Sequence, residues 1–139
     1  MVDYIVVGSG IGSFCICKRL ADEQKSFVVI SDFHNSATSV AGGIINPIIL
    51  KRFKPFWNAL DFYNEARIFY NNLQLQLDDK ILSNKEILRI FSSVEEQNNW
   101  YAAIDKPVLN KFLTPDLLDH HNQLISNFKL GQMQNAFLV

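Results

Sequence analysis

Three glycines follow a short run of β-forming residues near the start of the chain, in the stretch DYIVVGSGIGS. Gly8 allows a tight turn from a strand into a helix, and Gly10 lets a pyrophosphate approach the main chain without meeting a side chain. The amides of Ile11 and Gly12 then lie at a helix N-terminus, where the peptide dipoles attract negative charge. The spacing predicts a dinucleotide-binding turn in which Ser13 fills the third glycine position and weakens the packing of helix against strand.

Asp32 adds a second contact to this predicted site. It ends the apolar run KSFVVISD, close to the roughly twenty-residue spacing at which an acid accepts hydrogen bonds from the adenosine ribose. Phe33 follows it instead of an arginine, so the 2′-phosphate of NADP has no obvious partner. The simpler alternative is an α/β turn that holds no ligand.

A second glycine loop follows the same strand. The segment FHNSATSVAGGIINP is rich in small and polar residues, and five of the six glycines of the chain lie either in it or in the first turn. Ligands of open α/β sheets bind in crevices at the carboxyl ends of parallel strands. The two loops therefore predict a ligand site at that edge of the sheet.

The elements that must position these loops form a βαβ unit. Two runs of β-forming residues, 3–8 and 25–32, predict strands of the type buried in parallel sheets, and a helix is expected over 11–24 between them. A strand, a helix and a strand in this order indicate the α/β class.

The middle of the chain predicts a long helix and a second strand–helix pair. Aromatic and aliphatic residues recur at spacings of three and four after Pro55, which suits the first turn of a helix that continues to Leu77. A strand is expected over 85–93. Ser93, followed three residues later by a glutamate, predicts a capping box that opens a helix over 94–104.

The last part of the chain is less regular. The stretch LTPDLLDHH predicts a helical turn, with Thr114 as its cap and Pro115 at its first position. The final segment, 123–139, is apolar and ambiguous between helix and strand. We predict two segments, a nucleotide-binding part over 1–80 and the beginning of a second domain over 81–139.

Composition restricts the function classes. A net charge of −1 and a pI near 6.3 argue against nucleic acid as a partner. The longest apolar stretch, VAGGIINPIIL, contains proline and glycine and is too short to span a membrane, and the apolar start lacks the pattern of a secretory signal. We expect a cytoplasmic protein.

Few other residues suggest chemistry. The remaining candidates are two cysteines, three histidines and one arginine: Cys15, Cys17, His34, His120, His121 and Arg52. The cysteines are two positions apart on a predicted helix, which suits neither a disulfide nor a shared metal. The histidines have no cysteine or paired carboxylate at ligand spacing, so no metal site is expected, and the arginine is best explained as solvated surface.

Several of these motifs resemble a known family. DYIVVGSGIGS, the acid after FVVIS and above all SATSVAGGIINP resemble the amino-terminal portion of the FAD-dependent oxidoreductases of the D-amino acid oxidase superfamily, in particular the glycine oxidase and sarcosine oxidase-like members. EILRIFSSVEEQNNW and LTPDLLDHH are similar to the region where that family begins its substrate domain. The resemblance implies a Rossmann-like FAD-binding unit followed by the start of an α+β substrate domain, with the later parts of such enzymes missing.

The resemblance also implies how FAD would bind. Its pyrophosphate would lie on the turn from Gly8 to Gly12, its ribose on Asp32 and its flavin ring against the second loop. The flavin-side residues would be Ser39, Ala41, Gly42, Gly43 and Ile44, with Asn46 and Pro47 shaping the exit of the loop.

The implied reaction is hydride transfer from a small amine or amino acid to the flavin, and then to oxygen or another acceptor. No catalytic residue is assigned. One alternative is a truncated, non-catalytic fragment that binds FAD weakly or not at all. Another is an NAD-binding module, which would need a further βα unit soon after Asp32.

Overall fold

The computed structural model describes residues 1–32, 37–119 and 128–139. The chain forms two compact units, Met1–Gly43 and Ile44–Val139, which are treated separately below. The long helix predicted with the nucleotide-binding part belongs to the second unit, together with the strands of residues 81–139. The three histidines noted above, His34, His120 and His121, lie outside the described residues.

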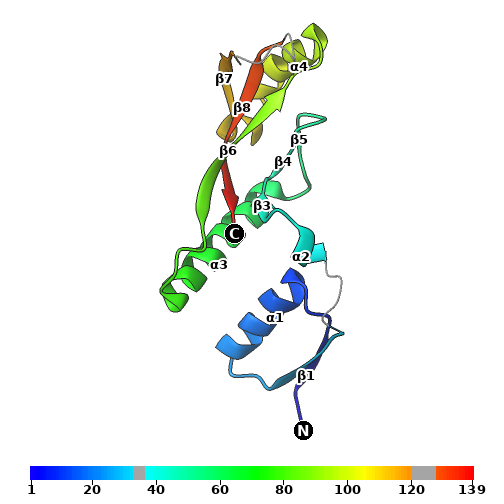
Figure 1. The fold of residues 1–139 in the computed structure, drawn as a ribbon, viewed down its shortest axis with the longest axis vertical. Helices are drawn as coiled ribbons and strands as arrows, with labels where there is room; N and C mark the ends of the chain where they lie inside the picture. Colours follow the sequence, from blue (N-terminus) through cyan, green and yellow to red (C-terminus); the bar gives the residue numbers. More distant parts are fainter. Residues whose placement is uncertain (33–36, 120–127) are drawn as a thin grey trace. The chain divides into compact units, whose positions relative to one another are not determined.

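The first unit contains the predicted βαβ arrangement (Figure 1). Strand β1 (Tyr4–Val7) is followed by helix α1 (Ile11–Asp22) and strand β2 (Phe27–Ile30). The two strands pair in parallel, with Tyr4 opposite Phe27 and Val7 opposite Ile30. This confirms the mixed α/β class. A short helix, α2 (Ala37–Val40), lies within the second loop.

The expectation that both strands are buried is wrong for the described chain. Ile5 is 65% exposed, Val7 78% and Ile30 54%, and Val6 is the only buried residue of the two strands. Parallel sheets normally bury both faces under helices, and two strands with one crossover helix cannot provide two covers. The strands have the apolar composition of a sheet whose two faces are covered by helices. In the first unit, however, much of their surface is exposed.

The second unit is built on an antiparallel sheet around strand β8 (Leu130–Leu138) (Figure 1). Strand β6 (Ser83–Ile90) pairs with β8 along one edge. On the other edge β8 pairs with β3 (Ile44–Ile45) near its end and with β7 (Leu113–Leu118) near its start. Residues 130–138 of the final segment, which was ambiguous in sequence, thus form the central strand of the sheet.

Two helices and a small hairpin complete this unit. They are α3 (Ala59–Leu77), α4 (Val94–Ile104) and the pair β4 (Ile48–Ile49) and β5 (Lys54–Pro55), with a 3₁₀ turn η1 (Leu109–Lys111) before β7. The predicted helix 94–104 is confirmed. The prediction that Pro55 opens the long helix is wrong, because Pro55 pairs with Ile48 in the hairpin and α3 begins only at Ala59.

The predicted helical turn at LTPDLLDHH is also wrong, since Leu113–Leu118 is strand β7. The register of β7 against β8 shifts between Leu113 and Leu117, so Pro115 lies in an irregular stretch of an edge strand, where its missing N–H costs least. The Thr114 hydroxyl, expected to cap a helix, donates instead to the carbonyl of Gln132 at 3.0 Å.

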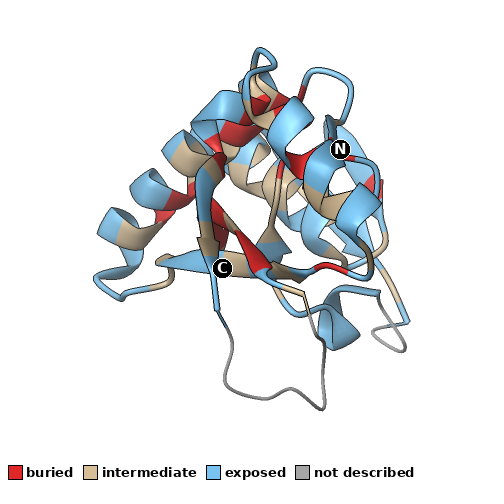
Figure 2. Cartoon of the chain, turned by 90° about the horizontal axis from the view of Figure 1, so that it is seen from above, coloured by how far each residue is buried: buried red, intermediate tan, exposed pale blue. Residues whose placement is uncertain are grey.

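Among the residues that the structure describes, every buried apolar residue except Val6 belongs to the second unit. Figure 2 colours the chain by burial. The largest fully buried side chains are Trp100, Phe91, Phe112, Phe137, Ile48, Leu109, Leu113 and Met133. Aromatic rings meet edge to face within this core, as in the pairs Phe53–Trp100 and Phe91–Trp100, whose centroids are 5.5 Å and 5.6 Å apart.

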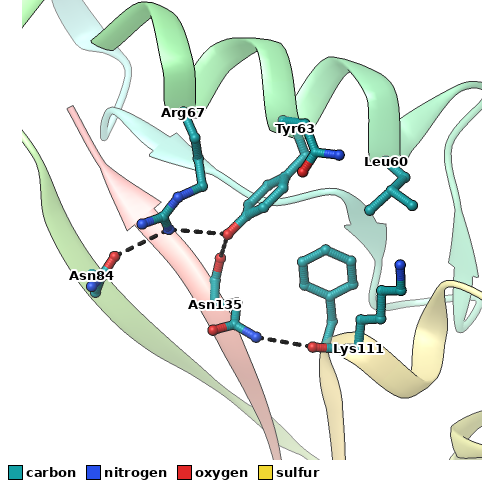
Figure 3. A pocket seen from close by; sticks show the side chains of 8 residues that line it. Leu60, Tyr63, Arg67, Asn84, Lys111 and Asn135 are labelled. Carbon is teal, nitrogen blue, oxygen red and sulfur yellow. Dashed lines mark hydrogen bonds between the residues drawn. The ribbon is translucent and has the colours of Figure 1, made fainter. Parts of the chain in front are cut away.

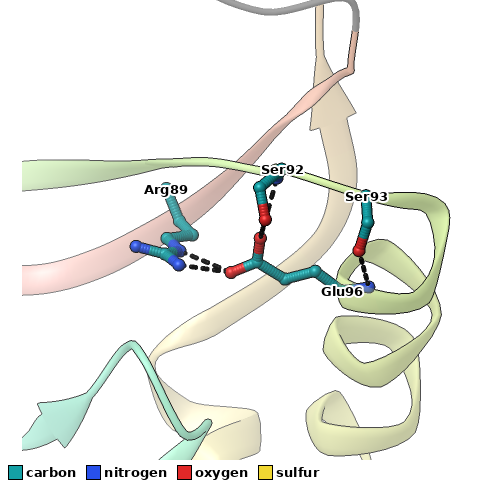
Figure 4. Close-up of polar contacts among 4 residues, drawn as sticks. All are labelled: Arg89, Ser92, Ser93 and Glu96. Atoms are coloured by element: carbon teal, nitrogen blue, oxygen red, sulfur yellow. Dashed lines mark hydrogen bonds and ion pairs between the residues drawn. The ribbon is translucent and has the colours of Figure 1, made fainter.

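The predicted capping box at the start of α4 is present and extended (Figure 4). The Ser93 hydroxyl accepts from the Glu96 amide at 3.0 Å. The Glu96 carboxylate reaches past Ser93 and accepts from the amide and the hydroxyl of Ser92, both at 2.8 Å, and it also pairs with the Arg89 guanidinium. The motif therefore ties the end of β6 to the start of α4.

We expect the second unit to lose stability in acid through Glu96. Burial alone would raise the pKa of Glu96, but the hydrogen bonds from Ser92 and the pairing with Arg89 outweigh it and hold this pKa below its ordinary value of 4.5. A carboxyl whose pKa is lowered by folding stabilises the folded state above its ordinary pKa, and this contribution disappears as the pH falls through the lower, folded-state value. Urea unfolding between pH 7 and pH 3 measures this decline. In Glu96→Gln the decline should be shallower, and an unchanged slope would contradict the assignment.

Gly131 is a packing glycine, and we expect Gly131→Ala to destabilise the protein by about 1–3 kcal/mol. A Cβ at this position would lie 2.7 Å from Phe91 Cζ and 2.8 Å from Trp100 Cε2, and both rings are fully buried. The matched control is Gly12→Ala, where a Cβ would meet nothing within 4 Å. Chemical denaturation of both variants measures the difference, and equal midpoints would show that the core accommodates the methyl group.

Candidate functional site

The turn after β1 has the backbone geometry that its glycines predict. Gly8 adopts a φ of 103°, which side-chain-bearing residues rarely adopt, and its amide donates to the carbonyl of Ile30 at 2.8 Å. Gly10 is the N-cap of α1, and its carbonyl accepts from the Phe14 amide at 3.0 Å. The chain thus passes directly from the strand into the helix, beside the end of β2.

The N-terminus of α1 faces a hydroxyl group. The Ile11 amide donates to Thr38 Oγ1 at 2.9 Å, and the first turn of the helix carries no acidic residue. The positive end of the helix dipole therefore meets an oxygen atom from α2. A Cβ added to Gly10 would lie 3.3 Å from the same oxygen, so the main chain and the Thr38 side chain are closely packed here.

Thr38 was not among the residues singled out from the sequence. It lies in a segment of small polar residues, and nothing in the sequence distinguishes this threonine from the serines beside it. Only its hydrogen bond to the Ile11 amide, across 27 positions of sequence, distinguishes it.

The end of β2 contacts the first loop. Ser31 Oγ donates to Ser9 Oγ at 2.8 Å, so a side chain at the carboxyl end of each strand joins the two loops. Asp32 follows directly and is exposed, as is Ser39 in α2. The role of Asp32 as a ribose-binding group stays a prediction.

The predicted flavin-side residues divide between the two units. Ser39, Ala41, Gly42 and Gly43 belong to the first unit, and Gly43 has a positive φ of 66°. Ile44 opens the second unit, where it pairs with Leu138 across β3 and β8. The loop after it turns through Asn46, whose Oδ1 accepts from the Ile48 amide at 2.8 Å.

Ser13, at the third position of the glycine pattern, packs beneath the turn. Its Oγ would lie 3.4 Å from a Cβ on Gly8, which is an ordinary van der Waals distance. The weaker packing of helix against strand expected at Ser13 stays a prediction.

The other candidate residues support no separate chemistry. The two cysteines of α1, Cys15 and Cys17, form no disulfide and are half-buried. Arg52 is exposed on the turn between β4 and β5. In the part of the chain that the structure describes, no three histidine, cysteine or acidic side chains gather as a metal site would require, and no helix is long and apolar enough to cross a membrane.

No protein-family model matches the chain, and no solved structure matches it. The arrangement around the glycine turn must therefore be interpreted by its own chemistry. It offers a helix N-terminus without acidic residues, a glycine-rich main chain and the hydroxyl groups of Ser9 and Ser31 at the ends of the two strands. This combination suits a phosphate-bearing ligand, because main-chain amides and hydroxyls can both donate to phosphate oxygens.

Proposed function

We propose that the chain supplies the dinucleotide-binding part of an FAD-dependent oxidoreductase that acts on a small amine or amino acid. The observation that carries the proposal is the glycine turn between β1 and α1, with Gly8 at a φ of 103° and the Ile11 amide directed at an oxygen atom. The resemblance of SATSVAGGIINP to the D-amino acid oxidase superfamily favours FAD over other dinucleotides.

The residues of the first unit fit the diphosphate of such a cofactor. Thr38 Oγ1 lies 2.9 Å from the Ile11 nitrogen, a distance at which a phosphate oxygen would also accept. Gly10, without a Cβ, leaves the main chain accessible, and no carboxylate in the first helical turn would repel the ligand. Bound FAD would have its diphosphate at Gly10 and Ile11 and its ribose at Asp32, with Gly42 and Gly43 toward the flavin.

In such an enzyme the chemistry of the cofactor determines which tasks are left to the protein. FAD supplies the acceptor for a hydride, so the protein needs no nucleophile of its own. The turn binds and orients the diphosphate through main-chain amides, and Asp32 would hold the ribose. The small residues at Ala41, Gly42 and Gly43 would let the backbone lie against a flat ring and donate to it.

Purified protein provides the direct test. The full chain is titrated with FAD and, separately, with NAD, and binding is followed by quenching of flavin fluorescence and by calorimetry. Saturable binding of FAD, tighter than that of NAD, is expected. If the chain binds neither dinucleotide, and if a longer protein containing it also purifies without flavin, the proposal is wrong.

A second candidate is a non-catalytic form that binds FAD weakly or not at all. The observation that favours it is the exposure of the strands next to the site, with Ile5 65% and Val7 78% exposed. A two-stranded sheet with exposed faces holds its loops less rigidly than a covered sheet. The same titration distinguishes the two candidates, since weak binding here with strong binding in a longer protein supports this second one.

We expect Thr38→Ala to bind FAD more tightly than the wild type. The substitution removes the hydroxyl with which a phosphate oxygen must compete for the Ile11 amide, and it also removes the close neighbour of Gly10. The first unit itself should lose about 0.5–2 kcal/mol, the usual cost of losing a side-chain acceptor at a helix N-terminus. The FAD titration measures the affinity and thermal unfolding measures the stability. Weaker binding in the variant would show that the Thr38 hydroxyl helps to hold the ligand.

A further inference from the structure

A cavity of about 340 Å³ in the second unit has polar walls that the packing of the unit explains (Figure 3). Tyr63 Oη donates to the Asn135 carbonyl at 2.6 Å. Arg67 Nη1 donates to Tyr63 Oη at 3.1 Å and to Asn84 Oδ1 at 3.2 Å. These hydrogen bonds join α3 to β6 and β8, so the four residues have a structural role.

A larger groove, of about 590 Å³, lies between helix α4 and the turn that joins β4 to β5. On the side of the helix it is lined by Ser93, Glu96, Asn99 and Ala102, at spacings of three, and by Lys106 just past the end of the helix. Residues spaced in this way lie on one side of a helix. The groove therefore follows the length of α4, which is about 16 Å for its 11 residues.

The opposite wall is a turn that packing holds in place. The Arg52 amide donates to the Ile49 carbonyl at 3.0 Å within this turn. Phe53 adopts a φ of 46°, which is unusual for a bulky residue, and its buried ring contacts Trp100 of α4 edge to face. Such a conformation persists only where the surrounding structure enforces it. The contact thus fixes the turn beside α4, with Arg52 and Lys54 exposed on either side of Phe53.

Positive charge is concentrated in this groove. Five cations and two acids line it, a balance of +3, whereas the whole chain has a formal net charge of −1, so the rest of the chain carries −4. Four of the cations, Lys51, Arg52, Lys54 and Lys106, form no ion pair within residues 1–32, 37–119 and 128–139. Like charges gathered in this way repel one another, and a negatively charged partner removes the repulsion.

The two acids of the groove do little to offset these cations. Glu96 Oε1 accepts from Arg89 Nε at 2.9 Å and also pairs with its Nη2, as Figure 4 shows. Glu96 and Arg89, the fifth cation, therefore neutralise each other. Glu95 lies in the first turn of α4, where the positive end of the helix dipole already favours a negative charge. An excess of positive charge remains along the turn and at Lys106.

The composition of the walls distinguishes among negatively charged partners. Single-stranded nucleic acid stacks its bases on exposed aromatic rings, but the aromatic residue of this lining, Phe53, is only 7% exposed. A lipid surface takes up exposed apolar side chains, and among the described residues that line the groove only Ala102 is one. An extended peptide suits the dimensions, because five residues of extended chain span about 16–18 Å.

We propose that the groove along α4 binds an extended acidic segment of a protein partner. Carboxylates of this segment pair with Lys51, Arg52 and Lys54 on the turn and with Lys106 beyond the helix. Asn99, exposed midway along α4, offers the main chain of the segment both a donor and an acceptor. The proposal goes beyond the proposed flavin function and does not rest on it, because all of these residues belong to the second unit.

Fluorescence anisotropy of a labelled hexaglutamate peptide, titrated with the full chain, gives the direct test. Saturable binding is expected at low ionic strength, and it should weaken as added salt screens the exposed charges. Hexaglutamine, which has the same length without the carboxylates, should not bind. Inorganic tripolyphosphate and a single-stranded deoxythymidine oligonucleotide are compared at the same salt concentration. No saturable binding of hexaglutamate, equal binding of hexaglutamine, or tighter binding of either phosphate-bearing probe would overturn the proposal.

Two double variants separate the groove from the general charge of the surface. Lys51→Gln combined with Arg52→Gln should weaken hexaglutamate binding by about four- to twenty-fivefold, or about two- to fivefold for each exposed ion pair lost. Lys80→Gln combined with Lys85→Gln removes the same charge from exposed positions outside the lining, and it should change the affinity by less than about twofold. Equal losses in the two double variants would show that the peptide is attracted without a site, against the proposal.

Glu95→Gln supplies a test that poor folding cannot imitate. It removes an exposed negative charge from the lining, so hexaglutamate should bind about two- to fivefold more tightly. Asn99→Asp adds a negative charge midway along α4 and should weaken binding by at least as much, with circular dichroism to confirm folding. Unchanged binding in both variants would mean that the peptide lies elsewhere, and the proposal would be wrong. FAD titration of these variants should match the wild type, which separates this test from that of the flavin function.

Discussion

Replacing Trp100 by alanine should lower the free energy of unfolding of the second unit by about 3–5 kcal/mol, the usual range for a fully buried tryptophan. Trp100 is 0% exposed and contacts Phe53 and Phe91 edge to face. Its Nε1 donates to the carbonyl of Thr114 at 3.0 Å, at the irregular stretch of β7. The ring therefore joins α4, the β4–β5 turn and β7, and the substitution both opens a cavity and leaves a carbonyl without its donor.

Tyr101→Ala is the matched control for this experiment. Tyr101 is the next residue of the same helix, and it is 44% exposed, so its truncation should cost less than about 1 kcal/mol. Trp100→Phe keeps an aromatic ring but loses the N–H, and its stability should lie between those of the wild type and the alanine variant. Urea unfolding monitored by far-ultraviolet circular dichroism measures all three. Similar midpoints for Trp100→Ala and Tyr101→Ala would show that the core does not depend on this ring.

The parts of the fold that the sequence predicted are those determined by local chemistry. The strands and helix of the βαβ unit follow from β-forming runs and from glycines at one junction. The cap at the start of α4 follows from Ser93 and Glu96 alone, because the bond from the Glu96 amide to the Ser93 hydroxyl joins residues three apart. Such signals do not depend on what the rest of the chain does.

The errors concern residues whose role is set by distant partners. Thr114 and Pro115 have the types that open a helix, but the Thr114 hydroxyl bonds to Gln132, on the neighbouring strand. Pro55 suits the first turn of a helix as well as it suits the edge of a hairpin. Its pairing with Ile48 decides in favour of the hairpin. Local sequence cannot reveal a cross-strand partner, so both sites favoured the local interpretation.

In the candidate site, too, the features set by local sequence were predictable and those set by distant contacts were not. The glycine turn was predictable because a φ of 103° at Gly8 demands glycine. Thr38 at the helix N-terminus was missed, because it is brought there by a contact across 27 positions of sequence.

Gly10→Ala should reduce FAD affinity by about tenfold to a hundredfold while leaving the protein folded. Alanine tolerates the φ of −78° and ψ of 178° found at Gly10, so the backbone need not change. The added Cβ would lie 3.3 Å from Thr38 Oγ1, a contact that a shift of a few tenths of an ångström relieves. A diphosphate bound at the same point requires the space that this methyl group takes, and it cannot give way in the same manner.

Gly12→Ala separates this steric effect from a general effect of alanine in the turn. A Cβ there meets nothing within 4 Å, and alanine in a helix is more stable than glycine by about 0.5–1 kcal/mol. Its main-chain amide is retained, so FAD should bind to it as to the wild type. Fluorescence titration of both variants, with circular dichroism to confirm folding, gives the comparison. Because the two glycines are two positions apart in the same turn, equal affinities would mean that the ligand does not approach the main chain at Gly10, and the turn would then be a structural feature of the βαβ unit alone.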